Sequence, residues 1–401
     1  MNNSTDICQT RNEKPSQQHT SDTLFDSGLP TTKIAIVGAG GFVGARFLRL
    51  VRQHPKAYGV GIVRSAKSLA RLSNMEVRVA DTSRASCLAG ALVDCDTVVN
   101  AVSGDLSRVL EETETIYTAA LAARCRLLVH LSSAVVFGRA LSPNIEDDSP
   151  PDTRSWMLYA RGKARSEVFL RQAMSAQPAM QVVVLRPGLV WGPGSHWSSM
   201  VGEQLSRGPV CLSNGGRGIA NLVYVDNLVQ MILAVHGSEG GPAGFYNVGD
   251  PQQVTWSHYY QSLARRLGYA ESDIKTWPDA HLPLTPKLAL EWCLQRQPLY
   301  RAARWLLPRV GLGFKAKAKK IMKGESLPPH GREGVPTAPP RLSREHWALQ
   351  NTAFCLPTNK FFRDYGPLEL TPLEDALDAT ASWLRFAGYA ATGPFDLSHL
   401  W

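Results

Sequence analysis

Residues 33–44 place a short apolar strand, a glycine-rich turn and an apolar helix in immediate succession, and this order restricts the fold more than any other segment. The sequence there is Lys33-Ile-Ala-Ile-Val-Gly-Ala-Gly-Gly-Phe-Val-Gly44. Unpaired N–H groups at a helix N-terminus, together with the helix dipole, favour a bound phosphate. We expect Gly38 to permit the tight turn, Gly41 to let the backbone approach a pyrophosphate, and Gly44 to let the helix pack closely on the strand. The G-x-x-G-x-x-G spacing in this context predicts a nucleotide-binding turn.

Strand-like and helix-like segments alternate through the first half of the chain. Repeated strand–helix units imply an α/β fold, a doubly wound parallel sheet of the Rossmann type, in which ligands bind beyond the carboxyl ends of the strands. We predict this dinucleotide-binding domain over residues 31–190 and a smaller, mostly C-terminal substrate-binding region over residues 191–401. The predicted strands are 34–38, 58–63, 77–79, 97–100, 127–131 and 181–185, and the predicted helices are 43–54, 69–72, 85–92, 106–124, 159–173 and 373–385.

Composition limits the class of protein. Residues 1–30 are polar and rich in Ser, Thr, Asn and Gln, so we expect a disordered tail, and they lack the apolar run of a secretory signal. No stretch has the roughly 20 apolar residues of a transmembrane helix. The seven cysteines are scattered without C-x-x-C pairs, and none of the ten histidines has metal-ligand spacing. This pattern favours a cytoplasmic protein with reduced thiols and no metal site.

The net charge of +9 is unevenly distributed, because residues 301–323 contain eight basic residues, no acidic residue and interleaved apolar side chains. Two interpretations stay open. One is an amphipathic element in peripheral contact with an anionic membrane surface, and the other, which we favour, is a solvated basic helix packed on the body of the protein. Nucleic-acid binding is disfavoured because no recognition motif accompanies the charge. Residues 324–342 are rich in Pro and Gly and predict a loop or linker.

Two segments contain residues suited to proton transfer. Leu131-Ser-Ser-Ala-Val-Val-Phe-Gly138 places Ser133 near the carboxyl end of a predicted inner strand. Tyr159 and Lys163 are four residues apart, which puts a phenol and an ammonium on one face of a helix. A free tyrosine has a pKa of about 10 and is a poor base at neutral pH, whereas a nearby cation stabilises the phenolate. We therefore expect Lys163, with a cationic nicotinamide ring, to lower the pKa of Tyr159 and let it exchange a proton with a substrate hydroxyl or carbonyl.

The order of these segments resembles the extended short-chain dehydrogenase/reductase superfamily, also called the NAD-dependent epimerase/dehydratase family. The resemblance runs from Lys33 to about Gly268, with a weaker match to Tyr389. It implies an NAD(P)-dependent enzyme in which Ser133, Tyr159 and Lys163 are catalytic and Lys163 also contacts the cofactor. The other cofactor contacts that it implies are Gly38, Gly41, Phe42, Val43, Gly44, Asp81, Thr82, Ala101 and Pro187. Further segments similar to the family are Leu185-Arg-Pro-Gly-Leu-Val-Trp-Gly-Pro-Gly194, Tyr224-Val-Asp-Asn227 and Tyr246-Asn-Val-Gly249.

Taken one at a time, these matches have structural alternatives. Ser132 suits a strand-end hydroxyl that bonds its own backbone as well as it suits a catalytic partner. For Asp81, a simple turn residue is the less favoured alternative to a cofactor contact. Arg186 and Pro187 can simply end a strand, and His130, in an apolar strand, is best interpreted as a core histidine. Ser133, Tyr159 and Lys163 favour a functional interpretation because they occur together.

The end of the second predicted strand bears on the choice of cofactor. Enzymes that hold NAD usually carry a carboxylate there for the ribose hydroxyls, whereas a basic residue accommodates the 2′-phosphate of NADP. Gly61-Ile-Val-Arg64-Ser65 offers Arg64 and no acid, with Lys67 close behind. We therefore expect NADP(H) in preference to NAD(H), with an Arg64 that points into solvent as the alternative.

The resemblance leaves the small-molecule substrate open. Nucleotide-sugar enzymes of the superfamily commonly carry an arginine where this chain has Ala220, although Arg217 lies three residues earlier. Dehydratases normally have an Asp-Glu pair where this chain has Ala134 and Val135. These differences favour hydride transfer at a secondary alcohol or ketone of a hydrophobic, sterol-like or lipid-like substrate over the nucleotide-sugar epimerase or dehydratase alternative.

Three further expectations concern surroundings and partners. The region of Trp191, Trp197 and Met200 is apolar enough to line a site for such a substrate. A homodimer stays open as a partner. A non-catalytic nucleotide-binding regulator is the remaining alternative, and the presence of both Tyr159 and Lys163 argues against it.

Overall fold

The computed structural model describes residues 32–103, 105–138, 145–176, 179–238, 240–252, 254–277, 293, 296–306 and 344–391. The predicted tail over residues 1–30, the linker over residues 324–342 and residues 307–323 of the basic segment lie outside the described residues. Within the ranges above, none of the helices has the length and apolar character needed to cross a bilayer.

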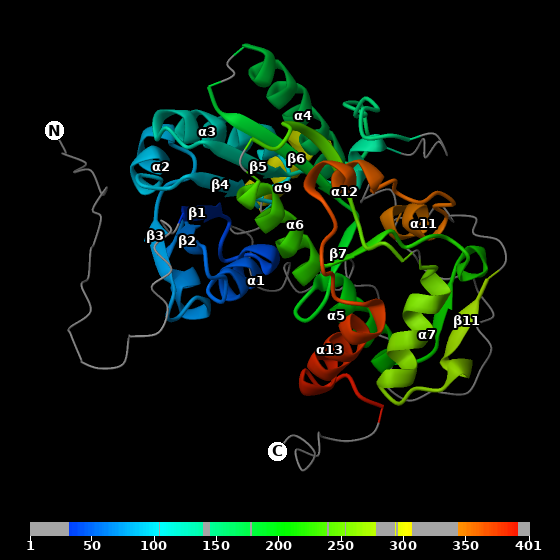
Figure 1. Ribbon diagram of the computed structural model, residues 1–401. Coiled ribbons are helices and arrows are strands. Elements are labelled where there is room, and N and C mark those ends of the chain that lie inside the picture. The colour runs from blue at the N-terminus through cyan, green and yellow to red at the C-terminus, as the bar shows by residue number, and fades with distance from the viewer. Residues whose placement is uncertain are drawn as a thin grey trace, which may run out of the picture.

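Seven parallel strands form the central sheet, in the order β10-β6-β5-β4-β1-β2-β3 (Figure 1). Successive side chains of β1 point to opposite faces, and Ile34 and Ala35 are both fully buried. Burial on both faces explains why the sequences of these strands are continuous apolar runs. The bounds are β1 (Thr32–Val37), β2 (Ala57–Val63), β3 (Glu76–Val79), β4 (Thr97–Asn100), β5 (Leu127–Leu131), β6 (Gln181–Pro187) and β10 (Gly244–Val248).

Helices cover both faces of this sheet, which confirms the doubly wound α/β architecture. α1 (Phe42–Val51) and α6 (Val225–Gly237) pack on one face, and α2 (Ala85–Ala91), α3 (Val109–Ala122) and α4 (Leu158–Ala176) pack on the other. The helix expected at residues 69–72 is a 3-10 helix over Ala66–Arg71. Because β4 and β2 flank β1, the strand order reverses between β1 and β4, and ligands of such sheets bind at that point.

A second, aromatic core lies beside the sheet, at the lower right of Figure 1. The rings of Trp191, Trp256, Tyr259 and Tyr260 are buried there, with Trp191 packed edge-on against Tyr259. This core is built from β7 (Leu189–Trp191), α5 (His196–Arg207), β8 (Val210–Leu212), β9 (Leu222–Tyr224), α7 (Trp256–Arg266), β11 (Ile274–Thr276) and α13 (Leu373–Phe386).

The helix predicted at the end of the chain is α13. Leu373, Ala376 and Leu377 are buried, as the periodicity predicts, whereas Trp383 is half-buried at the edge of the second core. α13 therefore closes this core from the C-terminal side.

The chain passes between the two cores more than once. Both α6 and β10 follow residue 190 in the sequence. β10 is a strand of the large sheet, and α6 packs on that sheet. After α9 (Gln297–Leu306), the described chain resumes at α11 (Arg344–Gln350) and continues through α12 (Asn359–Tyr365), which packs on the same face of the sheet as α1. Residues distant in sequence are thus brought to the carboxyl edge of the sheet.

Candidate active site

The glycine-rich turn joins β1 to α1 at the carboxyl edge of the sheet. Gly38 has a φ of +96°, and a Cβ there would lie 3.0 Å from the backbone of Ala101. A Cβ on Gly44 would lie 2.4 Å from the carbonyl oxygen of Gly38, so the helix packs directly on the turn. Gly41 is exposed at the N-terminus of α1. The turn therefore leaves the helix N-terminus accessible in the way that phosphate binding requires.

A cleft of about 320 Å³ opens beside this turn. Its lining includes five of the predicted cofactor residues: Gly38, Gly41, Arg64, Thr82 and Ala101. Ser65 and Ser68 also line it, and no acidic residue is among the described residues that do. The glycine backbone and this polar, non-acidic wall fit a dinucleotide.

Arg64 reaches from the end of β2 toward α3. Its guanidinium lies 3.7 Å from the carboxylate of Glu112, and its side chain is 57% exposed. Burial raises the pKa of Glu112, while Arg64 and Arg108 oppose that rise. Oε2 of Glu112 has no hydrogen-bond partner among the described residues. One end of Arg64 thus pairs with a buried carboxylate while the side chain still borders the cleft.

The remaining predicted cofactor residues lie near the cleft but not among those that line it. Phe42 and Val43 pack against the second core. Asp81 is exposed and accepts hydrogen bonds from the backbone N–H and the hydroxyl of Ser83, at 3.0 and 2.6 Å. Pro187 is buried at the end of β6. Their contacts with a cofactor stay predictions.

The structure brings the three predicted catalytic residues together. Ser133 follows β5 and caps the 3-10 helix over Ala134–Phe137, and its hydroxyl is hydrogen-bonded to that of Tyr159. Lys163 lies one helical turn after Tyr159 in α4, with Nζ 6.0 Å from the centre of the phenol ring. Nζ donates hydrogen bonds to the backbone carbonyls of Leu131, at 2.6 Å, and Val102, at 3.3 Å.

Burial shifts the pKa values of both Tyr159 and Lys163 in the protein alone. Burial raises the pKa of Tyr159 to about 12. The hydrogen bond with Ser133 lowers this pKa, and the charge of Glu345 raises it further. Burial also lowers the pKa of Lys163 to about 8, against the opposing effects of Glu112 and Glu167. The Lys163 ammonium is directed at the two strand-end carbonyls. In the protein alone, burial keeps the phenol of Tyr159 protonated at neutral pH.

A buried ion pair supports the helix that carries Tyr159. Glu167, one turn after Lys163, pairs with Arg186 of β6 at 2.6 Å, and both side chains are almost wholly inaccessible. The hydroxyl of Ser132 donates to the same carboxylate at 2.5 Å. Ser132 and Arg186 thus serve as structural partners of Glu167. The sequence analysis missed Glu167, although its spacing of four residues from Lys163 places it on the same helix face.

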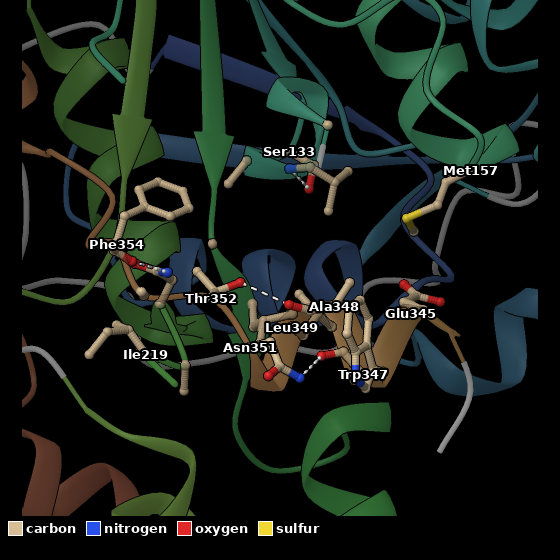
Figure 2. A pocket seen from close by; sticks show the side chains of 18 of the residues that line it. Ser133, Met157, Ile219, Glu345, Trp347, Ala348, Leu349, Asn351, Thr352 and Phe354 are labelled. Carbon is tan, nitrogen blue, oxygen red and sulfur yellow. Dashed lines mark hydrogen bonds between the residues drawn. The ribbon is translucent and has the colours of Figure 1, made fainter. Parts of the chain in front are cut away.

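A second cavity, of about 380 Å³, lies beside Ser133. Figure 2 shows Ser133 on one side of it and α11, with Trp347, Ala348 and Leu349, on the other. Most of its lining is apolar or neutral and comes from segments far apart in sequence. Further lining residues are Ala134, Val135, Trp156, Met157, Gly188, Ile219, Ala220, Asn221, Glu345 and Phe354.

Backbone contacts hold the floor of this pocket in place. Ile219 N–H donates to the carbonyl of Thr352 at 2.7 Å, and the indole N–H of Trp256 donates to the carbonyl of Leu349 at 3.0 Å. A Cβ on Gly218 would lie 2.0 Å from the carbonyl oxygen of Gln350, so the two segments touch directly. The acceptors in these contacts are backbone carbonyls, which every residue has. This explains why the sequence does not predict this wall.

The apolar lining differs from the expected one. Trp191 is fully buried and donates its indole N–H to Asp250 at 3.2 Å, while Trp197 packs against His346. Trp191, Trp197 and Met200 are absent from the described pocket lining, so the expectation that they line the site is wrong. Trp191 and Trp197 belong to the second core, and the aromatic walls of the pocket come from Trp156, Trp347 and Phe354.

Basic residues are absent from the described lining of this pocket. Ala220 lines it where nucleotide-sugar enzymes commonly carry arginine, as expected from the sequence. Arg217 is exposed and hydrogen-bonded to Asn214 at 3.3 Å, and it does not line the pocket. It therefore does not substitute for the missing arginine in this arrangement.

Comparison with known proteins gives a consistent picture. A model of the NAD dependent epimerase/dehydratase family matches residues 34–249, which is more than half of the chain. No curated protein sequence is similar enough to count as a match.

Solved structures with the same fold are numerous. A dTDP-glucose 4,6-dehydratase from Bacillus anthracis, in complex with NAD, has a TM-score of 0.61 at 15% identity, covering 89% of this chain and 97% of its own. A UDP-glucuronic acid 4-epimerase from Bacillus cereus, in complex with UDP-glucuronic acid and NAD, has a TM-score of 0.59 at 15% identity, with coverages of 89% and 100%. A dTDP-glucose 4,6-dehydratase from Streptomyces venezuelae has a TM-score of 0.60 at 19% identity, with coverages of 90% and 99%. At these identities the similarity establishes the fold.

Proposed function

The chain belongs to the NAD-dependent epimerase/dehydratase family of enzymes, and on that premise we propose that it is an oxidoreductase acting at a secondary alcohol or ketone of a largely apolar substrate. The observation that carries this proposal is the hydroxyl pair of Ser133 and Tyr159 beside a pocket whose described lining contains no basic residue. A nicotinamide dinucleotide, when bound, supplies or accepts the hydride.

Tyr159 is the group that exchanges the proton. Its raised pKa keeps the phenol protonated at neutral pH, which suits it to donate a proton to a substrate carbonyl during reduction. Ser133 hydrogen-bonds the same phenol and stabilises the phenolate that remains. Lys163 ties α4 to the ends of β4 and β5 through its two carbonyl contacts and so positions Tyr159.

We further propose NADP(H) as the preferred cofactor. Arg64, Ser65 and Ser68 border the cleft at the end of β2, and no described lining residue offers a carboxylate to the ribose hydroxyls. A guanidinium with hydroxyl neighbours suits a 2′-phosphate. Glu112 competes for the same guanidinium, so NADP(H) binding draws Arg64 away from that carboxylate.

A nucleotide-sugar substrate is the second candidate, because the solved structures named above are nucleotide-sugar enzymes. Against it, a sugar diphosphate would find no basic residue in the described pocket lining. Ala134 and Val135 also offer no acid–base group where dehydratases carry an Asp-Glu pair. These observations favour the apolar ketone or alcohol.

The test is to follow NADPH absorbance with purified protein and two substrate panels, one of sterol-like and lipid-like ketones and one of UDP- and dTDP-sugars. We expect oxidation of NADPH with ketones and none with the sugars. Product analysis of the sugar panel also detects epimerisation, which consumes no cofactor overall. Turnover confined to nucleotide sugars, or absence of turnover with every ketone, would refute the proposal.

A further inference from the structure

Asn221 lies where three separate stretches of the substrate pocket meet. It lines the pocket and is half-buried, and its φ of +40° lies in the left-handed region that Asn adopts more readily than most residues. Its carbonyl oxygen accepts a hydrogen bond from the N–H of Leu189 at 2.8 Å. A Cβ on Gly188 would lie 2.0 Å from the same oxygen. The backbone of Asn221 is thus fixed against the stretch that follows β6.

The side chain of Asn221 holds the third stretch, which begins 133 residues further along the chain at Phe354. Nδ2 donates to the carbonyl of Phe354 at 3.0 Å, and Oδ1 accepts from the N–H of Leu356 at 2.7 Å. The carboxamide thus uses both its donor and its acceptor on one short segment. Among the described residues, no other hydrogen bond reaches the backbone of Phe354 or Leu356. Removing the carboxamide should therefore release this part of the wall.

The same segment packs against the residues that follow Ser133. Leu356 is buried in an apolar cluster with Val136 and Phe137, which belong to the 3-10 helix that Ser133 caps. Phe354 packs at the edge of this cluster, and Figure 2 shows that it borders the same cavity as Ser133. The position of Phe354 relative to Ser133 therefore depends on this apolar packing and on the hydrogen bonds of Asn221.

We propose that Asn221 is a positioning residue that determines which ketones fit the pocket, because its carboxamide fixes the separation between Phe354 and Ser133. The inference rests on the proposed function of the pocket as the substrate site. The aromatic walls formed by Trp156, Trp347 and Phe354 suit flat ring systems. A thicker ring skeleton would have to displace a wall that is held by hydrogen bonds, and this disfavours its binding.

The test measures ligand binding and does not require turnover. Calorimetric titration of the full chain with NADP⁺ present compares two ketones of equal carbon number, the flat trans-2-decalone and the compact 2-adamantanone. We expect the wild type to bind the decalone at least about tenfold more tightly. Asn221→Gly removes both side-chain hydrogen bonds and permits the same φ, so it should bring the two affinities within about threefold of each other.

Asn74→Gly is the matched control. Asn74 is exposed, has a φ of +62° and is not among the described residues that line the pocket, so this variant should keep the wild-type ratio. Asn221→Asp is a second variant, which keeps the acceptor for Leu356 and loses the donor to Phe354. We expect it to give a ratio between those of wild type and Asn221→Gly.

The same ratio of affinities in wild type and Asn221→Gly would overturn the inference, and so would failure of both ketones to bind the wild type. If Asn221→Gly does not fold, a wild-type ratio in Asn221→Asp would overturn it instead. A changed ratio without hydride transfer to any ketone would support the positioning by Asn221 and refute the proposed oxidoreductase activity alone.

Discussion

The ammonium of Lys163 donates its 2.6 Å hydrogen bond to the carbonyl of Leu131 at the end of β5, and lies 6.0 Å from the centre of the Tyr159 ring. In the protein alone, this lysine therefore anchors α4 to the sheet. An oxidised nicotinamide ring, when bound, would add a positive charge that favours the phenolate.

Replacing Tyr159 with Phe should lower the turnover number by about 100- to 10,000-fold, because it removes the proton donor and leaves the cleft unchanged. The measurement is NADPH consumption with the best ketone substrate, beside fluorescence titration of NADPH binding. Tyr117→Phe is a suitable control, because the buried hydroxyl of Tyr117 has no hydrogen-bond partner among the described residues. Turnover near the wild-type level in Tyr159→Phe would mean that another group supplies the proton.

The buried Lys163 should make stability depend on pH. Its pKa in the folded protein is about 8, below its ordinary value of 10.5, so the unfolded chain binds the extra proton between these values. The free energy of unfolding should therefore gain about 3 kcal/mol as the pH rises from about 8 to about 10.5. Urea unfolding of wild type and Lys163→Met across this range measures the contribution as a difference.

The comparison with Lys163→Met is needed because buried thiols change the free energy of unfolding with pH in the opposite direction. Burial raises the pKa of Cys95 and Cys125, so the folded protein retains their protons and loses stability as the pH rises above their ordinary values. Both proteins share this effect. Identical pH profiles would show that the pKa of Lys163 is not depressed.

Replacing Arg64 with Ala should weaken NADPH binding by about 10- to 100-fold and leave NADH binding nearly unchanged, since only the 2′-phosphate contact is lost. Titration of both cofactors measures this selectivity. Glu112→Gln should tighten NADPH binding, because Arg64 no longer has an anionic competitor at 3.7 Å. If Arg64→Ala lost the same affinity for NADPH and for NADH, the predicted preference for NADP(H) would be contradicted.

Glu167→Gln should lower the free energy of unfolding by about 3–5 kcal/mol, because Arg186 would be left buried without its counter-charge. Chemical denaturation provides the measurement. Glu203→Gln, the control, removes the exposed ion pair with Arg207 and should lower the free energy of unfolding by less than about 1 kcal/mol. Similar losses in the two variants would contradict the assigned role of the buried pair.

The solvated-helix interpretation of the basic segment stays a prediction. Arg301 in α9 pairs with Glu111 of α3 at 3.0 Å, while Trp305 is 59% exposed. We expect little co-sedimentation with anionic vesicles at physiological salt, with Trp305→Ser as the comparison at low salt. Strong binding that Trp305→Ser abolishes would favour the membrane-surface alternative instead.

The parts of the fold that depend on local pattern were predictable. The turn at Gly38 and the packing at Gly44 require glycine for steric reasons that the spacing alone conveys. The helical spacing of Tyr159 and Lys163 likewise placed both on one face of α4. The direction of the Lys163 ammonium was not predictable, because it depends on carbonyls at the ends of two other strands.

The floor of the pocket could not be predicted from the sequence, for a different reason. Glu345 is more than two hundred residues from Ser133, and the acceptors that join this wall to the rest of the chain include the backbone carbonyls of Leu349 and Thr352. Backbone donors and acceptors are the same in every residue except proline, so they carry no signal in the sequence.

The hydroxyls of Ser133 and Tyr159 come from residues 133–159, whereas the opposite wall of the cavity comes from residues 345–354. These two stretches lie more than two hundred residues apart in the chain and meet at the cavity. Substitutions within residues 345–354 should therefore change the shape of the cavity while leaving Ser133 and Tyr159 in place.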